Sequence, residues 1–579
     1  MRRFSDGASV FSHGGTSLKI TRHTVAAATI ALAAVAFAAD TPKKPAADVP
    51  KLVENIDIRV INVDVVVTDK KGNRIRGLKK DDFEIYENGV PKTISNFYEV
   101  DSPPKAPAAT AAPQPGPTLA QIEQIPDNQK RRIIFYIDNL SLMPFNRNRV
   151  FKEMKEFAKT VLRPGDEAMV ATFNRSMKIR NAFTRDPIQI QQTLDTLAGE
   201  SALGVSGKSE WRDTESRIND AQSVDDALSA ARSYAQSAEH DLRQSVTSLT
   251  GLMTTLAGVE GKKVVVLTTE GFQMQPGREM FMLVDEVSRQ KGWNAAGAIM
   301  EGMQFNNSDL IQSVARTANA NGITLYAIHA GGLGAGNDNI MADSSRATSY
   351  TVTQTAVSNS TESLQLMADL TGGIATINTN NFASAFKTIA NDLDGYYSLG
   401  YRAGTERIDR QRSLDVRLKN GRGLIVRNRQ SFVEKSTFAE MTDRVVANLL
   451  YRTKANDLKI AVRSSNPVPQ QDGNFQVPIE IQIPMDNLTL LPQGEIHAGG
   501  FTVYVAVANK DGDMSDVSHK THQIVVKNAE VEKSKGKYYT YSLTLLMEPG
   551  LNKISVGVVD DVSNVTGFAK DQVIAQDMR

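Results

Sequence analysis

Residues Arg131–Ser141, RRIIFYIDNLS, give the strongest indication of the fold in this chain of 579 residues. Behind the two arginines, the mostly apolar run Ile133 to Ile137 predicts a strand that is buried on both faces. The run ends at Asp138, at the position where open α/β sheets place their ligand sites. Apolar residues then recur at helical spacing from Val150 to Val161 and predict an amphipathic helix. Strand, loop and helix in this order indicate an α/β fold, and Asp138 is the residue on which a functional interpretation depends.

The alternation of strand and helix continues over residues 131–395, which we interpret as one α/β domain with a mainly parallel sheet and helices on both faces. A second buried strand is predicted at Lys262–Leu267, just before Glu270, and another at ITLYAIHA, which contains His329. The polar stretch 201–241 interrupts the rhythm and is expected to be a partly helical insertion. The Ser-, Thr- and Gln-rich run from Ser344 to Ser363 is expected to form a mobile rim.

Segments with strand-like alternation flank this domain. Residues 56–100 predict a small antiparallel β unit, and residues 396–435 predict strands that pair with it. The Pro- and Ala-rich stretch 101–130 between them reads as a linker. A helix and short strands over residues 436–579 suit an immunoglobulin-like β-sandwich. We therefore expect the α/β domain to be inserted into one β module and followed by another.

The N-terminus predicts export. Basic residues precede an apolar run from Val25 to Ala39, which ends in the small-x-small pattern Ala36-Phe37-Ala38. The run is shorter than the ~20 residues that span a bilayer, which favours a signal peptide over residues 1–39 rather than the alternative, an uncleaved anchor. A flexible leader over residues 40–55 would follow. We expect a periplasmic or secreted protein with no transmembrane segment after cleavage.

Composition narrows the function classes. The formal net charge is only +1, so there is no electrostatic case for binding nucleic acid. The chain has no cysteine, which excludes disulfides, thiol catalysis and Cys-ligated zinc.

Three short sequence segments resemble those of a known protein family. VTDKKGNRIRGLKKDDFEIYENG at residues 67–89, GKKVVVLTTEGF at 261–272 and DLDGYYSLGY at 392–401 resemble the von Willebrand factor A-like (VWFA-related) proteins of the Acidobacterial type. The likeness covers roughly residues 55–435. It implies a Rossmann-like VWA domain flanked by β-sandwich modules.

The resemblance also implies a metal-ion-dependent adhesion site for Mg²⁺ or another divalent cation. Asp138 matches the first aspartate of the family's Asp-x-Ser-x-Ser motif, but Leu140 and Leu142 stand at the serine positions. Ser141 is displaced by one residue, and Glu270 stands where the family has an aspartate after the fourth strand. The family's middle-loop threonine cannot be placed. The implied site, Asp138, Ser141 and Glu270, is therefore degenerate.

Asp138 has an alternative role that needs no metal. It would either cap the helix that follows or pair with one of three nearby arginines, Arg131, Arg147 or Arg149.

The predicted function is that of an exported, non-catalytic binding or adhesion protein that recognises a protein or peptide partner in the cell envelope or outside the cell. The loops at the carboxyl ends of the strands would form the binding rim, with five candidate residues: Asp138, Asn139, Ser141, Glu270 and His329. The sequence contains no G-x-S-x-G nucleophile elbow, which favours binding over catalysis. The alternatives are an extracytoplasmic enzyme that uses the same rim and a structural or assembly component of the cell envelope.

Overall fold

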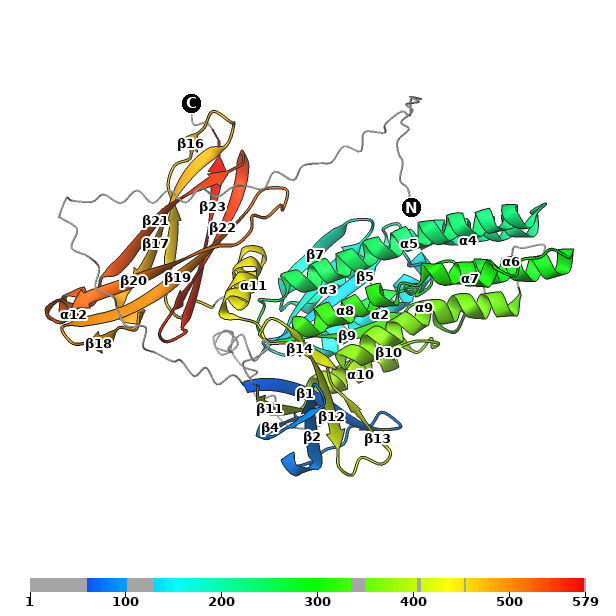
Figure 1. Ribbon diagram of the computed structural model, residues 1–579, viewed down its shortest axis with the longest axis horizontal. Coiled ribbons are helices and arrows are strands. Elements are labelled where there is room, and N and C mark those ends of the chain that lie inside the picture. Colours follow the sequence, from blue (N-terminus) through cyan, green and yellow to red (C-terminus); the bar gives the residue numbers. More distant parts are fainter. Residues whose placement is uncertain (1–59, 102–129, 335–348, 404–407, 452–454, 577–579) are drawn as a thin grey trace, which may run out of the picture.

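The computed structural model describes residues 60–101, 130–334, 349–403, 408–451 and 455–576. Figure 1 shows three parts: a small β module, a central domain of strands and helices, and a C-terminal β module. The predicted signal peptide and leader, and nearly all of the predicted linker, lie outside the described residues. Within the described ranges, no helix is both long and apolar enough to cross a membrane.

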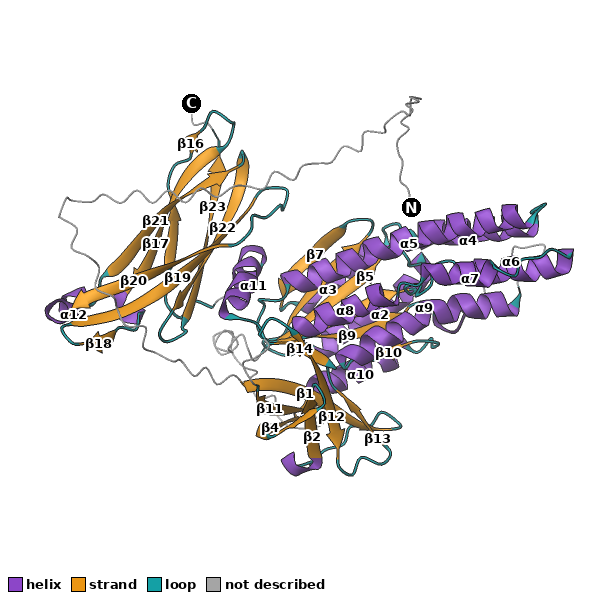
Figure 2. Cartoon of the chain, in the orientation of Figure 1, coloured by secondary structure: helices purple, strands orange, loops and turns teal. Residues whose placement is uncertain are grey.

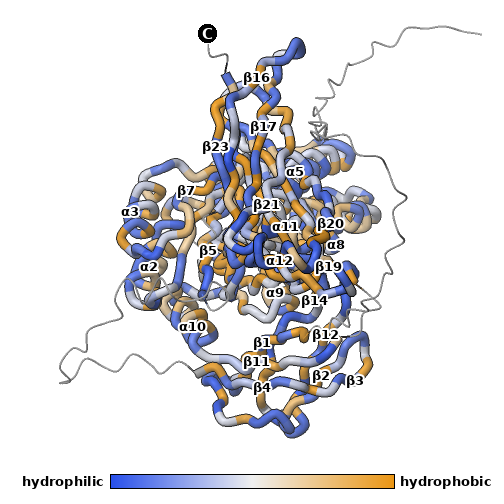
Figure 3. Tube along the Cα trace, turned by 90° about the vertical axis from the view of Figure 1, so that its left-hand side faces the viewer, coloured by the Kyte–Doolittle hydropathy of each residue, from blue (hydrophilic) through white to orange (hydrophobic). Residues whose placement is uncertain are grey.

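A six-stranded sheet forms the centre of the α/β domain. All of its neighbouring strands pair in parallel except β7, which is antiparallel to β6 at one edge. Every residue of β5 is buried, as its apolar sequence predicts, and hydrophobic colour gathers around it in Figure 3. The strands, in sheet order, are β10 (Ala375–Thr376), β9 (Ile323–His329), β8 (Lys262–Thr269), β5 (Arg131–Asp138), β6 (Glu167–Phe173) and β7 (Met177–Thr184).

Helices cover both faces of this sheet, so the predicted α/β class is confirmed (Figure 2). Apolar residues of α2, α3 and α10 form the core on one face, and those of α5, α8 and α9 form the core on the other. The helices of the domain are α2 (Pro144–Val161), α3 (Pro187–Ala198), α4 (Gly204–Asn219), α5 (Val224–Thr255), α6 (Arg278–Lys291), α7 (Ala298–Gly302), α8 (Ser308–Ala320), α9 (Tyr350–Thr371) and α10 (Phe382–Asp394).

The structure bears out one of two sequence predictions about this domain and contradicts the other. The stretch 201–241 is helical, as expected, over α4 and the first half of α5, and α5 continues without a break to Thr255. Its small residues Ala227, Ala231 and Ala235 face a buried core, so helix packing does not need large apolar side chains here. The expected mobile rim is also helical from Tyr350 onward, within α9.

The helices α4, α5, α6, α7 and α9 extend beyond the sheet as a bundle of their own (Figure 1). The bundle has a separate core that includes Trp211, Tyr234, Met280, Phe281 and Val352. It rises from the carboxyl edge of the sheet, so that edge is not the open face that the sequence suggests.

The small β module consists of two four-stranded sheets formed from segments on both sides of the α/β domain. The strand β1 pairs with β11 and β13, and β2 pairs with β12. The sheets enclose one core, in which Phe83 and Phe97 contact Tyr397. The strands are β1 (Val60–Asp69), β2 (Phe83–Glu87), β3 (Val90–Lys92), β4 (Ile94–Asp101), β11 (Gly395–Arg402), β12 (Gln411–Leu418), β13 (Leu424–Arg427) and β14 (Ser431–Val433).

The C-terminal module is a sandwich of two antiparallel sheets, joined to the α/β domain through α11 (Thr437–Leu450). On α11, Val445 packs on the sandwich while Ala447 joins the core of the α/β domain. The remaining elements are β15 (Ala461–Ser464), β16 (Val468–Pro469), β17 (Phe475–Pro484), β18 (Leu491–Gln493), β19 (Ile496–Ala508), β20 (Ser518–Lys527), α12 (Asn528–Ser534), β21 (Tyr538–Met547), β22 (Gly550–Asp560) and β23 (Thr566–Ala575).

Candidate functional site

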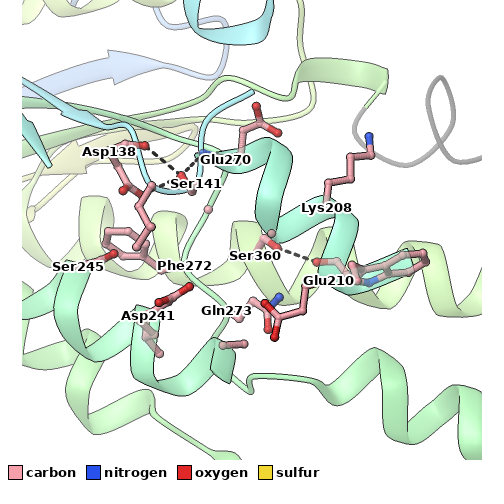
Figure 4. Close-up of a pocket in the computed structure, with 18 of the residues that line it drawn as sticks. Asp138, Ser141, Lys208, Glu210, Asp241, Ser245, Glu270, Phe272, Gln273 and Ser360 are labelled. Carbon is pink, nitrogen blue, oxygen red and sulfur yellow. Dashed lines mark hydrogen bonds between the residues drawn. The ribbon is translucent and has the colours of Figure 1, made fainter. Parts of the chain in front are cut away.

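A cavity of about 290 Å³ lies between the carboxyl edge of the central sheet and the helical bundle. The sheet contributes Asp138, Glu270 and His329 to its wall, and the bundle contributes side chains from α4, α5, α6 and α9. Figure 4 shows this arrangement. Its volume lies near the lower limit of small-ligand pockets, so it suits one side chain or a small molecule.

Asp138 is held by two hydroxyl groups. Its Oδ2 atom accepts hydrogen bonds from Ser141 Oγ at 2.7 Å and from Thr269 Oγ1 at 2.8 Å. Its Oδ1 atom is buried and has no hydrogen-bond partner among the described residues. Burial raises the pKa of Asp138, and the bonds from Ser141 and Thr269 oppose that rise. The carboxyl group is therefore half satisfied by the fold.

Both alternative roles predicted for Asp138 are wrong. The helix α2 follows Met143, whose own side chain makes no capping hydrogen bond, and Asp138 bonds Ser141 and Thr269 instead. The three candidate arginines bond elsewhere: Arg131 with Asp166 and Asp394, Arg147 with Asn139, and Arg149 with the carbonyl of Ala330.

The carboxyl group of Glu270 accepts hydrogen bonds from the segment that joins β5 to α2 and from the first turn of α2. Its Oε1 atom accepts hydrogen bonds from the backbone N–H of Met143 at 2.6 Å and from Asn146 Nδ2 at 3.1 Å. Burial raises its pKa, and those two bonds oppose the rise. Glu270 thus fastens the start of α2 to the end of β8.

The implied divalent cation does not fit this donor set. Besides bonding Asp138, Ser141 Oγ accepts the backbone N–H of Glu270, and Thr269 Oγ1 accepts the backbone N–H of Gly271. These hydroxyl groups are engaged within the fold, and Leu140 offers no side-chain oxygen. A hard cation needs several free oxygen ligands. Within the described residues, no group of three or more His, Asp or Glu side chains could hold a metal ion.

His329 lines the cavity but does not pair with an acid. Its Nε2 atom lies 3.2 Å from the carbonyl oxygen of Glu270, so Nε2–H donates in the neutral tautomer. Its buried Nδ1 atom has no hydrogen-bond partner in the described part of the chain. Burial lowers the pKa of His329, which favours the neutral ring.

Asn139, the remaining candidate, does not line the cavity. Its amide donates to the carbonyl of Ser201 at 3.1 Å and accepts from Arg147 at 2.8 Å. The backbone beside it is joined to the start of α4, because Gly204 N–H donates to the carbonyl of Leu142. A Cβ atom at Gly204 would lie 2.4 Å from the carbonyl oxygen of Ser141, so this contact requires glycine. Asn139 therefore anchors the bundle rather than facing a ligand.

Sequence reasoning missed the residues that the bundle brings to the cavity. Trp211 and Tyr234 form part of its wall, and Glu210, Asp241 and Glu279 add carboxyl groups. These side chains come from three helices, two of which lie in a stretch that the sequence indicates only as an insertion. Thr269 could have been predicted from the sequence, because it is the last residue of the apolar strand that precedes Glu270.

The comparisons with known proteins found no matching family model and no matching curated protein. Similar solved structures include an aerotolerance-related membrane protein from Bacteroides fragilis, with 13% identity, a TM-score of 0.22 and coverage of 46% of this chain and 98% of that chain. The PilB minor pilin from Streptococcus sanguinis has 12% identity, a TM-score of 0.25 and coverage of 46% and 62%. Proximal thread matrix protein 1 from the mussel byssus, with a zinc-occupied MIDAS motif, has 12% identity, a TM-score of 0.20 and coverage of 48% and 49%. Likenesses this weak carry no argument about function.

Proposed function

We propose that this chain is an exported, non-catalytic binding protein with a VWA-like domain that takes a segment of a protein or peptide partner into the cavity at the carboxyl edge of its sheet. The observation that carries the proposal is the cavity itself, which is walled by aromatic and acidic side chains and contains buried carboxyl oxygens without partners. A buried polar group without a partner costs about 1–3 kcal/mol, and a ligand that supplies the missing bond removes that cost.

The hydrogen bonds at the rim support binding rather than catalysis. An enzyme at this rim would use Asp138, Glu270 and His329. The carboxyl group of Glu270 is held by Met143 N–H, and His329 donates to a backbone carbonyl instead of a carboxylate. A general base needs its proton-accepting atom within reach of the reacting group. These contacts favour a structural role for two of the three groups.

Export is part of the proposal and rests on the N-terminal sequence. Immunoblots of cell fractions should find the protein in the periplasm or the culture medium, with a mass reduced by the loss of the signal peptide. A full-length protein in the cytoplasm would contradict export without affecting the cavity.

A selection from a random peptide library tests whether the cavity binds peptides. Ala356 of α9 lines the cavity, and Ala356→Trp would fill it. The exposed Gln354 lies on the same helix outside the lining, so Gln354→Trp is the matched control. We expect the selected peptides to bind Ala356→Trp at least about tenfold more weakly than the wild type or the control. Equal binding to all three proteins would overturn the proposed function, and so would a selection that yields no binding peptide.

A further inference from the structure

We propose that the cavity recognises a positively charged side chain, an arginine or a lysine, presented by the partner. This inference rests on the proposed function and names the chemistry of what enters the cavity. It differs from recognition of a partner's carboxylate through a metal ion, because here the protein itself supplies the negative charge.

The charge balance of the wall is the first argument. Five carboxyl groups line the cavity, from Asp138, Glu210, Asp241, Glu270 and Glu279. Among the described residues that line it, the single lysine is Lys208, and the single histidine has a pKa lowered by burial. A cation that enters this space meets more acidic than basic side chains, in a region of low dielectric constant where charges interact strongly.

The second argument is a pair of carboxylates on the solvent side. Glu210 is exposed on α4, and Asp241 is partly buried on α5. Figure 4 shows both residues at the wall of the cavity, with Gln273 between them. Burial raises the pKa of Asp241, the positive charge of Arg175 lowers it, and the charge of Glu210 raises it by a smaller amount. A cation close to both carboxylates relieves the repulsion between them.

The third argument is independent of the pair and lies deeper. Glu279 lines the cavity at the start of α6, and its side chain is 0% exposed. Neither of its carboxyl oxygens has a hydrogen-bond partner in the described residues. Burial raises its pKa, and its own backbone N–H together with Asn359, Trp211 and Tyr234 lies near enough to oppose that rise, but none makes a hydrogen bond of good geometry with it. A fully buried carboxyl group without a hydrogen-bond partner can accept a hydrogen bond from a donor group of a ligand.

Lys208 does not already supply this donor. Its ammonium group interacts with the charge of Glu270, on the side of the cavity nearest α2. In Figure 4 the Lys208 side chain points away from Asp241 and Asp138. Lys208 therefore leaves the carboxyl groups on the other side of the cavity unpaired by its own charge, and Asp241 interacts with Arg175, which lies outside the lining.

The apolar part of the wall suits the same ligand. Trp211, Tyr234 and Phe272 line the cavity. Aromatic faces attract ammonium and guanidinium groups and also pack against the aliphatic stem of lysine or arginine. A carboxylate ligand would gain neither interaction and would face five acidic side chains.

Binding of defined peptides to the full chain tests the inference. The probes are short Gly/Ser peptides that differ at one central position, which is arginine, lysine, the neutral isostere citrulline, or glutamate. We expect the arginine and lysine peptides to bind at least about tenfold more tightly than the citrulline peptide, with or without Mg²⁺. The double variant Glu210→Gln/Asp241→Asn should lose about tenfold in affinity for the arginine peptide. Asp213→Asn removes an exposed charge from the same helix outside the lining and should change nothing.

Each contrary result overturns the inference. Equal binding of arginine and citrulline peptides would do so, as would no binding of either cationic peptide, tighter binding of the glutamate peptide with Mg²⁺, or unchanged affinity in the double variant. Thermal unfolding of each variant checks that it is folded. The variant Glu279→Gln, which changes a fully buried wall residue, should likewise lose affinity for the arginine peptide. The selected peptides could bind the wild type more tightly than Ala356→Trp while the arginine and lysine peptides do not bind. In that case the proposed function stands, and only the recognition of a cationic side chain is refuted.

Discussion

The two edges of the central sheet differ in how their buried acids are partnered. At the amino edge, where β5 begins, Arg131 bonds Asp166 and Asp394, and Arg132 pairs with Glu167. Nearby, between the α/β domain and the small β module, Arg427 bonds both carboxyl oxygens of Asp392 at 2.8 Å. These charges are neutralised within the fold.

At the carboxyl edge the same strand ends in Asp138, one of whose oxygens has no partner in the described residues, and Glu279 nearby has none on either oxygen. Removing one partner of a buried charge pair leaves the other charge unpaired and is strongly destabilising, whereas a buried acid without a partner is a candidate for a functional site. The amino edge should therefore be the more sensitive to loss of a charged residue, and the carboxyl edge holds the acids that the proposed binding function would use.

Breaking a pair at the amino edge should have the largest effect. Arg131→Ala leaves Asp166 buried without its main partner and removes a bond to Asp394. We expect the free energy of unfolding to fall by about 3–5 kcal/mol, measured by urea denaturation. The control is Arg289→Ala, which removes an exposed pair with Asp285 and should cost less than about 1 kcal/mol. Equal losses in the two variants would remove the distinction drawn for this edge.

Removing an unpaired charge at the carboxyl edge should act in the opposite direction. Burial raises the pKa of Glu279 above its ordinary value of 4.5, so the native state holds its proton more tightly than the unfolded chain. The stability that this proton contributes is present at acid pH and is lost as the pH rises through the native pKa. Glu279→Gln should therefore raise the free energy of unfolding near neutral pH by about 1–3 kcal/mol. Denaturation at several pH values should show the gain shrink toward pH 4.5, and a destabilised variant at neutral pH would contradict the unpaired state of this group.

A smaller effect is expected where the carboxyl edge does satisfy its acid. Thr269→Val keeps the shape of the side chain and removes one hydroxyl donor from Asp138. We expect a loss of about 1–2 kcal/mol in the free energy of unfolding. In a double-mutant cycle with Asp138→Asn the two losses should not add, because both changes disrupt one hydrogen-bonded group. Additive losses would show that Thr269 and Asp138 do not interact energetically.

The elements that were predictable from sequence are those with strong local signals. The apolar run before Asp138 predicts β5, because a strand buried on both faces has no polar alternation. The first half of α9 was missed because its Ser and Thr residues suggest a loop, whereas the second half shows helical spacing at Leu364 and Met367. In the structure, Thr361 and Ser363 donate to backbone carbonyls of their own helix, so these polar side chains are satisfied while buried.

The site residues also fall into those that the sequence could place and those that it could not. Asp138, Glu270 and His329 could be placed on one edge because each follows or ends a predicted parallel strand, and such ends meet at one edge. Asp241 and Glu279 could not be placed, because their positions depend on how the helices of the bundle pack on one another. No local pattern around either residue reports that packing.

The smallest expected effect concerns His329. Its measurement distinguishes a neutral His329 ring in the cavity wall from a charged one. Burial lowers its pKa below the ordinary value of 6.5, so the unfolded chain binds a proton more readily than the native state. The stability it contributes is therefore present above pH 6.5 and is lost as the pH falls through that value toward the native pKa. His329→Asn should flatten the pH dependence of the free energy of unfolding in this window by about 1 kcal/mol or less. A titration of the His329 ring by NMR gives the direct measurement. A midpoint above 6.5 would mean that the acids of the cavity charge the histidine, and the carboxyl edge would then satisfy part of its own negative charge.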